Sequence, residues 1–387
     1  MPIINRMAEL HDDIAAWRRD FHSDPELLYD VKRTAGKVAS LLRTMGCDEV
    51  VEGMGRTGVV GVIHGARGGG TIGLRADMDA LPIEEETGKP WASKNPGLMH
   101  ACGHDGHTAM LLGAARYLAE TRNFAGKAVI IFQPAEEGGA GGKAMVDDGL
   151  MDRFAIQEVY GLHNMPGLAV GRFAIRPGPI MASTDEFEIT FRGHGGHAAM
   201  PHLCVDPVVA AAQCVNALQT IVSRGTDPLA SLVVSVTQLR AGHAHNVIPD
   251  TAWLNGTVRS LTGERRDYAE RRLREIAHGV AATNGLSAEV VYDRSYPVTV
   301  NHPEQTEKAI AIASAIAGAA HVDAEVSPLM GGEDFSFMLE ARPGAFIFMG
   351  NGDTSGLHTA QYDFNDHAIP YGSSYWAKLV ETLLPAA

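Results

Sequence analysis

A chain of 387 residues is too long for one ordinary hydrophobic core, so its length predicts two domains. Hydrophobic residues make up 45% of the sequence and charged residues 20%, which is typical of a globular enzyme. The net charge of −14 argues against nucleic acid or an anionic membrane surface as a partner, because both would repel an acidic protein.

Cysteine usage and the N-terminal residues indicate a cytoplasmic protein. Cys47, Cys102, Cys204 and Cys214 do not have the spacing of a disulfide framework, and reduced thiols are the simpler interpretation. The first residues, MPIINRMAELHDD, lack the apolar core of a signal peptide. No apolar run has the length of a membrane span. We therefore expect the protein in the cytoplasm, without membrane association.

The first part of the chain alternates helical and strand patterns. Apolar residues from Leu10 to Phe21 recur at helical spacing, a second helix has Val38 to Met45 on its apolar face, and a further helix is expected at about 108–121. Apolar, β-branched runs predict strands at 57–64, 71–74, 128–132 and 158–162. This alternation is typical of an α/β sheet, in which functional residues gather at the carboxyl ends of the strands.

The pattern changes at residue 183. Phe187, Ile189 and Phe191 alternate with polar residues, as on a sheet with one solvated face. The elements expected next are a helix at 206–223, strands at 232–239 and 253–259, a helix at 263–283 and a strand at 288–292. Their β-α-β-β-α-β order is ferredoxin-like. We therefore predict an α/β domain formed by residues 1–182 and 295–387, with an α+β domain, residues 183–294, inserted in it.

The stretch MHACGHDGHTAM, residues 99–110, concentrates side chains that bind metals. Cys102, His104, Asp105 and His107 fall within six residues. Side chains two apart in an extended segment point to the same side, so Cys102 and His104 can face one point in space. Thiolate and imidazole are transition-metal ligands. The alternative is that Cys102 is a small buried hydrophobic residue and His107 an ordinary residue of a helix N-terminus.

A second informative stretch is QPAEEGG, residues 133–139, directly after an expected strand. Because neighbouring side chains on a strand point in opposite directions, one glutamate can bind a metal while the other acts on a water molecule. Taken alone, the stretch fits a solvated acidic turn at least as well.

Two further histidines, His163 and His358, follow expected strands. A lone histidine is more often a hydrogen-bonded polar residue than a metal ligand. Here each histidine is placed at the end of an expected parallel strand, as are Cys102 and Glu137. Such strand ends converge on one edge of a sheet, which favours a shared site over four separate structural roles.

Nine motifs in this order resemble those of the M20 metallopeptidases: GLRADMDALP, MHACGHDGHTA, FQPAEEG, GLHN, GHGGHAAMPH, HNVIPD, GTVRS, GGEDFS and a late LH. The greatest similarity is to the amidohydrolase branch, which includes hippurate hydrolases, N-acyl-amino-acid deacylases and auxin-conjugate hydrolases. The resemblance covers nearly the whole chain. It implies a zinc-peptidase-like α/β domain with an inserted lid or dimerisation domain, and it implies a homodimer formed through that insert.

The resemblance also assigns roles at the site. Glu136 matches the general base, and Asp77 matches the aspartate that orients a ligand in much of the family. Five residues match the metal ligands of the branch: Cys102, His104, Glu137, His163 and His358.

Two divalent metal ions are implied, but their identity is left open. Many M20 peptidases have a histidine ligand where this chain has Arg75, and an aspartate bridge in place of the Cys/His pair. Arg75 cannot be a ligand, because guanidinium stays protonated. A thiolate in the set changes metal preference, so manganese, zinc, cobalt and nickel all remain candidates.

In the insert, the resemblance assigns His197 to the lid histidine, which reaches the active site of a neighbouring subunit. Asn246 and Arg259 match residues that hold the substrate carboxylate in relatives, for which a planar guanidinium is well suited. Without the resemblance, His197 fits a surface histidine in a Gly-rich hairpin, and Arg259 fits a strand residue in a surface ion pair.

The expected activity is metal-dependent hydrolysis of the amide bond of N-acyl amino acids, with Glu136 as base and His197 at the oxyanion. The alternatives are a dipeptidase or aminoacylase of the same family, and a non-catalytic small-molecule binder. The absence of a G-x-S-x-G motif argues against a serine hydrolase.

Overall fold

The computed structural model describes residues 3–386. They form two compact units. The first unit comprises residues 3–180, 300–327 and 334–386, and the second comprises residues 181–299 and 328–333.

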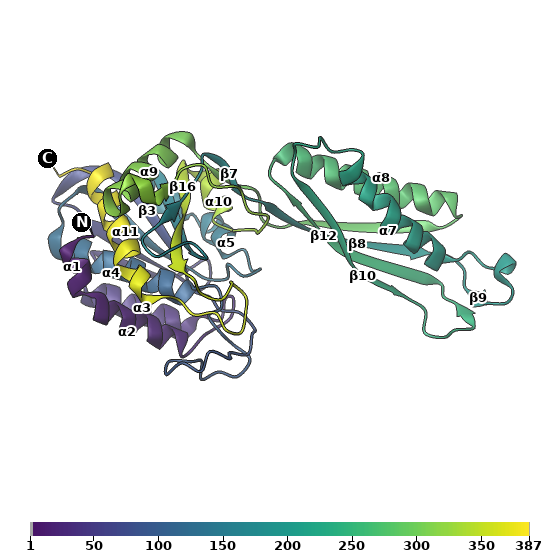
Figure 1. Ribbon diagram of the computed structural model, residues 1–387, viewed down its shortest axis with the longest axis horizontal. Coiled ribbons are helices and arrows are strands. Elements are labelled where there is room, and N and C mark those ends of the chain that lie inside the picture. Colours follow the sequence, from purple (N-terminus) through teal and green to yellow (C-terminus); the bar gives the residue numbers. More distant parts are fainter. Residues whose placement is uncertain (1–2, 387) are drawn as a thin grey trace. The chain divides into compact units, whose positions relative to one another are not determined.

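The first unit contains an eight-stranded sheet with the strand order β1-β2-β4-β3-β5-β16-β6-β15 (Figure 1). Its four central strands, β4, β3, β5 and β16, run parallel, whereas β1 and β2 are antiparallel additions at one edge. The strands are β1 (Glu49–Met54), β2 (Gly58–His64), β3 (Arg67–Asp77), β4 (Ala125–Gln133), β5 (Glu158–Pro166), β6 (Phe173–Ala174), β15 (Val322–Asp323) and β16 (Gly344–Gly352).

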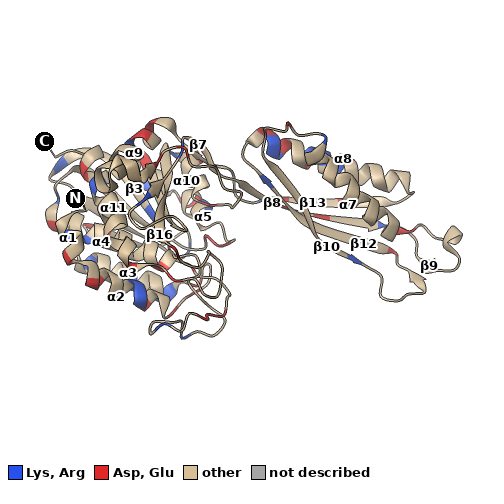
Figure 2. Ribbon diagram, in the orientation of Figure 1, with Lys and Arg blue, Asp and Glu red and all other residues tan. Residues whose placement is uncertain are grey.

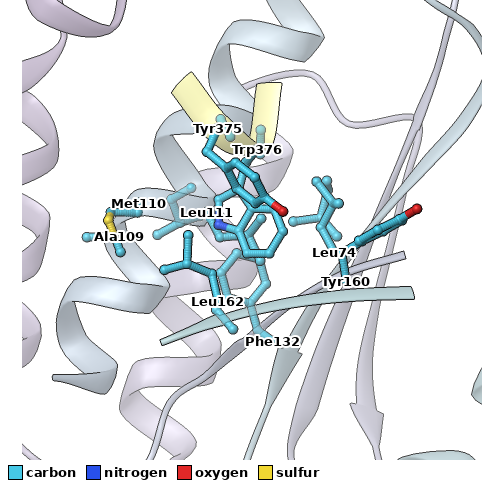
Figure 3. Close-up of a cluster of buried hydrophobic side chains, with 14 of the residues drawn as sticks. Leu74, Ala109, Met110, Leu111, Phe132, Tyr160, Leu162, Tyr375 and Trp376 are labelled. Carbon is cyan, nitrogen blue, oxygen red and sulfur yellow. The ribbon is translucent and has the colours of Figure 1, made fainter. Parts of the chain in front are cut away.

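Helices pack against this sheet and enclose a continuous apolar core. Figure 3 shows Tyr375 and Trp376 above Leu162 and Phe132, with Leu111 beside them. Each large apolar side chain buried in this way contributes about 1.5–3 kcal/mol to stability. The helices are α1 (Asn5–Glu9), α2 (His11–His22), α3 (Lys32–Thr44), α4 (His104–Thr121), α5 (Gly141–Asp147), α6 (Leu150–Arg153), α9 (Pro303–Ala317), α10 (Ser336–Ala341) and α11 (Ile369–Leu383).

The second unit is a four-stranded antiparallel sheet, ordered β10-β12-β8-β13, with two helices packed on one face. Both helices have side-chain caps: the carboxylate of Asp206 accepts from the N–H of Val208, and Thr262 accepts from Arg265. In chain order the elements are β8 (Ser183–Arg192), α7 (Pro207–Ser223), β10 (Leu232–Ala241), β12 (Thr251–Ser260), α8 (Gly263–Thr283) and β13 (Ser287–Arg294). This is the expected ferredoxin-like order.

Two small sheets complete the described strands. One pairs β9 (Gly196–His197) with β11 (Val247–Ile248), and the other pairs β7 (Gly178–Met181) with β14 (Thr299–Asn301).

The boundaries of the two units differ from the expected ones at three short segments. We assigned residues 1–182 and 295–387 to the α/β domain, but residues 181–182, 295–299 and 328–333 belong to the second unit, and only segment 328–333 lies away from an expected boundary. The N–H of Ala182 donates to the carbonyl oxygens of Leu329 (3.1 Å) and Gly331 (2.9 Å), and Met181 forms a β-bridge with Leu329. These backbone bonds attach the segment to the residues just before β8, which local sequence patterns do not reveal.

Acidic and basic residues are mixed along the surface helices rather than segregated by sign (Figure 2). Within residues 3–386, none of the helices combines the length and apolar character that a membrane span requires.

Candidate metal centre

The four central parallel strands end at the same edge of the first sheet. β3 ends at Asp77, β4 leads into the turn with the two glutamates, and α4 begins at His104. Seven of the residues singled out in the sequence lie at or just beyond these strand ends or around the start of α4: Asp77, Cys102, His104, Glu136, Glu137, His163 and His358.

The five expected metal ligands form two groups that share Cys102. In one group Cys102 lies with His104 and His163, and in the other with Glu137 and His358. Within each group the ligand atoms all lie within 4.8 Å of one another. The Cys102 Sγ is 3.4 Å from Nε2 of His163 and 3.3 Å from Nε2 of His358. The structure therefore brings all five residues together, with the sulfur between the two groups.

Two histidines have their ring nitrogens assigned by hydrogen bonds. Nδ1 of His104 donates to the carbonyl oxygen of Asp79 at 2.8 Å, and Nδ1 of His163 donates to the carbonyl oxygen of Asn164 at 2.7 Å. A carbonyl oxygen only accepts, so in the neutral ring, the form that binds a metal, the proton sits on Nδ1 and the lone pair on Nε2. Both Nε2 atoms therefore present a lone pair to the cluster.

The cluster has the donor types that a divalent transition metal requires. It offers one thiol, three imidazoles and carboxylates, which are the usual ligands of zinc and related ions. Nε2 of His104 is fully buried and makes no hydrogen bond within residues 3–386. A buried lone pair without a donor is costly, and a bound cation would satisfy it. The residues present thus fit a metal centre.

The charges around the cluster also favour a cation. Burial lowers the pKa of His104, but the carboxylates of Asp77, Asp79 and Glu137 outweigh it and raise the pKa to about 10. Burial raises the pKa of the Cys102 thiol well above its usual value, and the neighbouring carboxylates add to this effect. Both shifts show that the cluster carries an excess of negative charge, which a divalent ion would neutralise.

Glu136 joins the cluster through His104 and Glu137, whose ligand atoms lie within 4.8 Å of one of its carboxylate oxygens. The position of both glutamates is set by Asp79. The carboxylate of Asp79 accepts from the backbone N–H of Glu136 and of Glu137, each at 3.0 Å. Asp79 thus holds the turn with the two glutamates through its carboxylate, and it fixes the tautomer of His104 through its carbonyl oxygen. We had not singled it out, although its place two residues beyond Asp77 at a strand end was a usable signal.

Asp77 is held by two buried side chains. Its Oδ1 accepts from Nδ1 of His107 at 2.7 Å, and its Oδ2 accepts from Arg75 at 2.8 Å. Burial raises the pKa of Asp77, but His104, Arg75 and His107 outweigh it and hold the pKa well below its usual value. Asp77 is therefore an ionised carboxylate, and its Oδ2 lies 3.6 Å from Nε2 of His104.

Arg75 is fully buried, and its positive charge is paired with buried carboxylates. Besides Asp77, its guanidinium donates to Gln133 at 2.8 Å and to the carboxylate of Asp334 at 2.9 Å. Gln133 also donates to Asp334. Arg75 thus links the ends of β3 and β4 to the residues before α10. Its role here is structural, at the position where many M20 peptidases have a histidine ligand.

The three expected substrate-facing residues all lie in the second unit. His197 is exposed in β9, where its Nδ1 accepts from the N–H of Ala199 at 3.1 Å. Asn246 is exposed beside it, and its carbonyl oxygen accepts from the N–H of Ala198. Arg259, on β12, is half-buried and donates to the side chain of Thr257. The pairing of β9 with β11 therefore brings His197 and Asn246 together, whereas Arg259 lies on the main sheet.

Comparison with known proteins identifies the family. The family model for peptidase family M20/M25/M40 matches residues 73–382. The hippurate hydrolase of Campylobacter jejuni is 42% identical over 379 residues, which cover 98% of this chain and 98% of that enzyme. The N-acetylcysteine deacetylase of Bacillus subtilis is 39% identical over 375 residues, covering 97% of each chain.

A solved structure agrees over the full length. The crystal structure of a Bacillus subtilis protein, described as a dinuclear metal binding peptidase from the M20 family, superimposes with a TM-score of 0.85 at 35% identity. The match covers 98% of this chain and 100% of that one. It confirms the expected α/β fold. The chain therefore belongs to peptidase family M20/M25/M40 and is a metal-dependent amidohydrolase.

Proposed function

We propose that the protein hydrolyses the amide bond of N-acyl amino acids, releasing a carboxylic acid and a free amino acid. The observation that carries the proposal is the cluster of five ligand side chains with Glu136 beside it. The relatives narrow the substrate class, because hippurate and N-acetylcysteine are both N-acyl amino acids with a free carboxylate.

We assign the metal ligands to the two groups that share Cys102: Cys102, His104 and His163 in one, and Cys102, Glu137 and His358 in the other. The dinuclear description of the Bacillus subtilis structure supports two ions. Bound divalent ions lower the pKa of a water molecule and polarise the amide carbonyl. Manganese and zinc are our first candidates, with cobalt and nickel as further ones.

Glu136 is the proposed general base. It removes a proton from the attacking water as the new C–O bond forms the tetrahedral intermediate, and it delivers that proton to the amine nitrogen as the intermediate collapses and the amide C–N bond breaks. Its backbone is fixed by Asp79 at 3.0 Å, which keeps the carboxylate beside the ligands without making it one of them. Asp77 is the proposed orienting aspartate for His104, from which it lies 3.6 Å away.

The second unit is proposed to supply substrate contacts. His197 stabilises the oxyanion of the tetrahedral intermediate, and Asn246 with Arg259 holds the free carboxylate of the substrate. We propose a homodimer formed through this unit, in which His197 serves the site of the partner subunit. The exposure of His197 and Asn246 is compatible with such a role. We place the protein in the cytoplasm, in keeping with four free cysteines.

The rival within the family is a dipeptidase, in which the acyl group is an aminoacyl group. The description of the Bacillus subtilis structure as a peptidase favours this possibility. A non-catalytic binder is disfavoured, because Glu136 and all five proposed ligands are present.

A substrate panel separates these functions. Purified protein, stripped and reloaded with manganese, zinc, cobalt or nickel in turn, is assayed on benzoyl, acetyl and aminoacyl derivatives of several amino acids. We expect turnover of benzoyl or acetyl amino acids with at least one metal. Activity confined to the aminoacyl derivatives would establish the dipeptidase instead, and no hydrolysis of any member would contradict the proposal.

A further inference from the structure

Beneath the candidate ligands, one buried residue connects three separate segments. The Asn164 side-chain Nδ2 donates to the carbonyl oxygen of Cys102 at 2.6 Å and to Nε2 of His107 at 3.0 Å. Its backbone N–H also donates to Nε2 of His107, and its carbonyl oxygen accepts from Nδ1 of His163. The hydroxyl of Tyr362 donates to Oδ1 of Asn164 at 2.7 Å. Asn164 therefore joins β5, the start of α4 and the loop after β16.

These contacts converge on one of the two ligand groups. The side chain of Asn164 holds the backbone of Cys102, and its main-chain carbonyl oxygen, which the variants below retain, fixes the ring of His163. Asn164 reaches His104 through His107, one turn further along α4, whose N–H donates to the carbonyl oxygen of Gly103. Both nitrogens of His107 are engaged in hydrogen bonds, so this ring supports the site rather than binding metal.

The other ligand group is held by different residues. The backbone of Glu137 is fixed by the carboxylate of Asp79 at 3.0 Å. The N–H of His358 donates to the carbonyl oxygen of Ala101 at 2.8 Å. Loss of Asn164 leaves both of these hydrogen bonds in place. The two metal positions consequently have separate supports, although they share the Cys102 sulfur.

The close packing around Asn164 explains the glycine between the two ligands of this group. Gly103 has φ +90°, a left-handed conformation that favours glycine. A Cβ there would lie 2.3 Å from Nδ2 of Asn164 and 2.4 Å from the hydroxyl oxygen of Tyr362. Only a glycine lets the backbone between Cys102 and His104 approach Asn164 this closely.

We infer that Asn164, oriented by the hydroxyl of Tyr362, is a positioning residue chiefly for the metal ion bound by Cys102, His104 and His163, because the ion bound by Cys102, Glu137 and His358 shares only Cys102 with the contacts of Asn164. The inference rests on the two-metal assignment in the proposed function. Residues that orient metal ligands typically affect metal affinity by about 10–100-fold. Without the Tyr362 hydroxyl, the amide of Asn164 loses the donor that fixes its orientation.

The test measures metal affinity rather than turnover. Tyr362→Phe removes only the hydroxyl, and Asn164→Ala removes the whole amide. Tyr375→Phe is the matched control, because Tyr375 is also fully buried but its hydroxyl makes no hydrogen bond within residues 3–386. Equilibrium dialysis with manganese or cobalt, followed by elemental analysis, gives the number and affinity of bound ions per chain. Thermal unfolding of the metal-free proteins checks that each variant is folded.

We expect the wild type and Tyr375→Phe to bind two ions alike. Tyr362→Phe should bind one ion as the wild type does and the other about 10–100-fold more weakly. The metal-free variant should still fold, with a moderately lower melting temperature, because the buried Oδ1 of Asn164 loses its donor. Asn164→Ala should show a larger loss at the same ion. If Asn164→Ala does not fold, Tyr362→Phe alone decides the matter.

Double variants identify which ion is weakened. Combined with His163→Ala, Tyr362→Phe should cause no further loss, because both changes act on the same position. Combined with His358→Ala, it should weaken the one ion that remains. The reverse pattern, equal weakening of both ions, or wild-type affinity for both ions in Tyr362→Phe would overturn the inference. Wild-type protein that binds fewer than two ions would instead contradict the proposed function.

Discussion

Most of the candidate metal ligands are held differently from the candidate substrate residues of the second unit, although one ligand, His358, has a side chain that is 51% exposed. His104 and His163 are buried, and each has one ring nitrogen fixed by a backbone carbonyl. His197 and Asn246 are exposed at the small sheet of β9 and β11, and Arg259 is half-buried on β12. Metal binding requires ligands fixed before the ion arrives, because each misplaced ligand costs affinity.

Residues that meet a substrate have the opposite requirement. They gain their contacts when the substrate or a second subunit is present, and loops and exposed strands suit that role. Under the proposed function, we therefore expect a metal centre preorganised within one chain, and substrate contacts of the second unit that depend on a further component. Each prediction that follows tests one side of this contrast.

The largest effect is expected at the glutamate pair. Glu136→Gln keeps the hydrogen-bonding shape but removes the base, so kcat should fall by about 10²–10⁴-fold while metal content stays at the wild-type level. Glu137→Ala should lose metal instead, because it removes a ligand. Rates and bound metal measured on both variants decide this division of roles. Equal metal loss with similar residual rates would contradict it.

Two neighbouring arginines test how strongly the stability of the first unit, which contains the metal ligands, depends on a buried charge. Arg18 is fully buried and donates to Asp366 at 2.7 Å. It also forms an ion pair at 3.6 Å with Asp105, the residue after His104. Arg19 also binds Asp366 but its side chain is 44% exposed. Arg18→Gln should cost about 3–5 kcal/mol of unfolding free energy.

Arg19→Gln is the matched control and should cost about 1 kcal/mol or less, since exposed ion pairs contribute little. Urea denaturation of the two metal-free variants gives the comparison. If both lost the same stability, burial of Arg18 would not be what anchors the start of α4.

The substrate side is tested by removing a charge from the substrate. Converting the free carboxylate of the preferred N-acyl amino acid to a neutral amide should reduce kcat/KM by the equivalent of about 2–5 kcal/mol, because it leaves Arg259 without its anionic partner. Arg259→Gln should narrow that difference between the acid and the amide. Equal kcat/KM for acid and amide in the wild type would rule out carboxylate recognition by Arg259.

The smallest expected change is the partial recovery of activity that tests the proposed dimer. Glu136→Gln and His197→Ala should each be nearly inactive alone. In a heterodimer of the two, one site combines intact Glu136 with intact His197 of the other subunit, so random co-assembly should recover roughly a quarter of wild-type activity. If heterodimers form and the mixture is no more active than the separate variants, His197 does not act across subunits.

Much of the fold could be predicted from local patterns. The helix expected at 263–283 has those bounds in the structure, and the helix expected at 206–223 begins one residue later, because periodicity and capping signals are local. The helix expected from residue 108 begins at His104 instead. Gly103 adopts a left-handed conformation there to pack against Asn164, and this tertiary contact overrides the local pattern.

The short elements were missed for a related reason. Helices α5 and α10 have seven and six residues, too few to show a periodic pattern. At the site, residue types and strand ends brought the ligand set together, but they did not indicate the supporting residues. Apart from the bond between Asn164 and its neighbour His163, Asp79 and Asn164 support the site through hydrogen bonds to residues at least 25 positions away in sequence, such as His104 and Cys102, and no local spacing encodes those contacts.

The most direct test is to count bound metal ions against turnover in the same samples. The protein is stripped with a chelator, verified as metal-free, and titrated with manganese or zinc while hydrolysis of a benzoyl or acetyl amino acid is followed. We predict no turnover in the metal-free protein and a rise that reaches its maximum at two ions per chain. Full turnover in the verified metal-free protein would contradict the central claim that this cluster is a metal-dependent amidohydrolase centre.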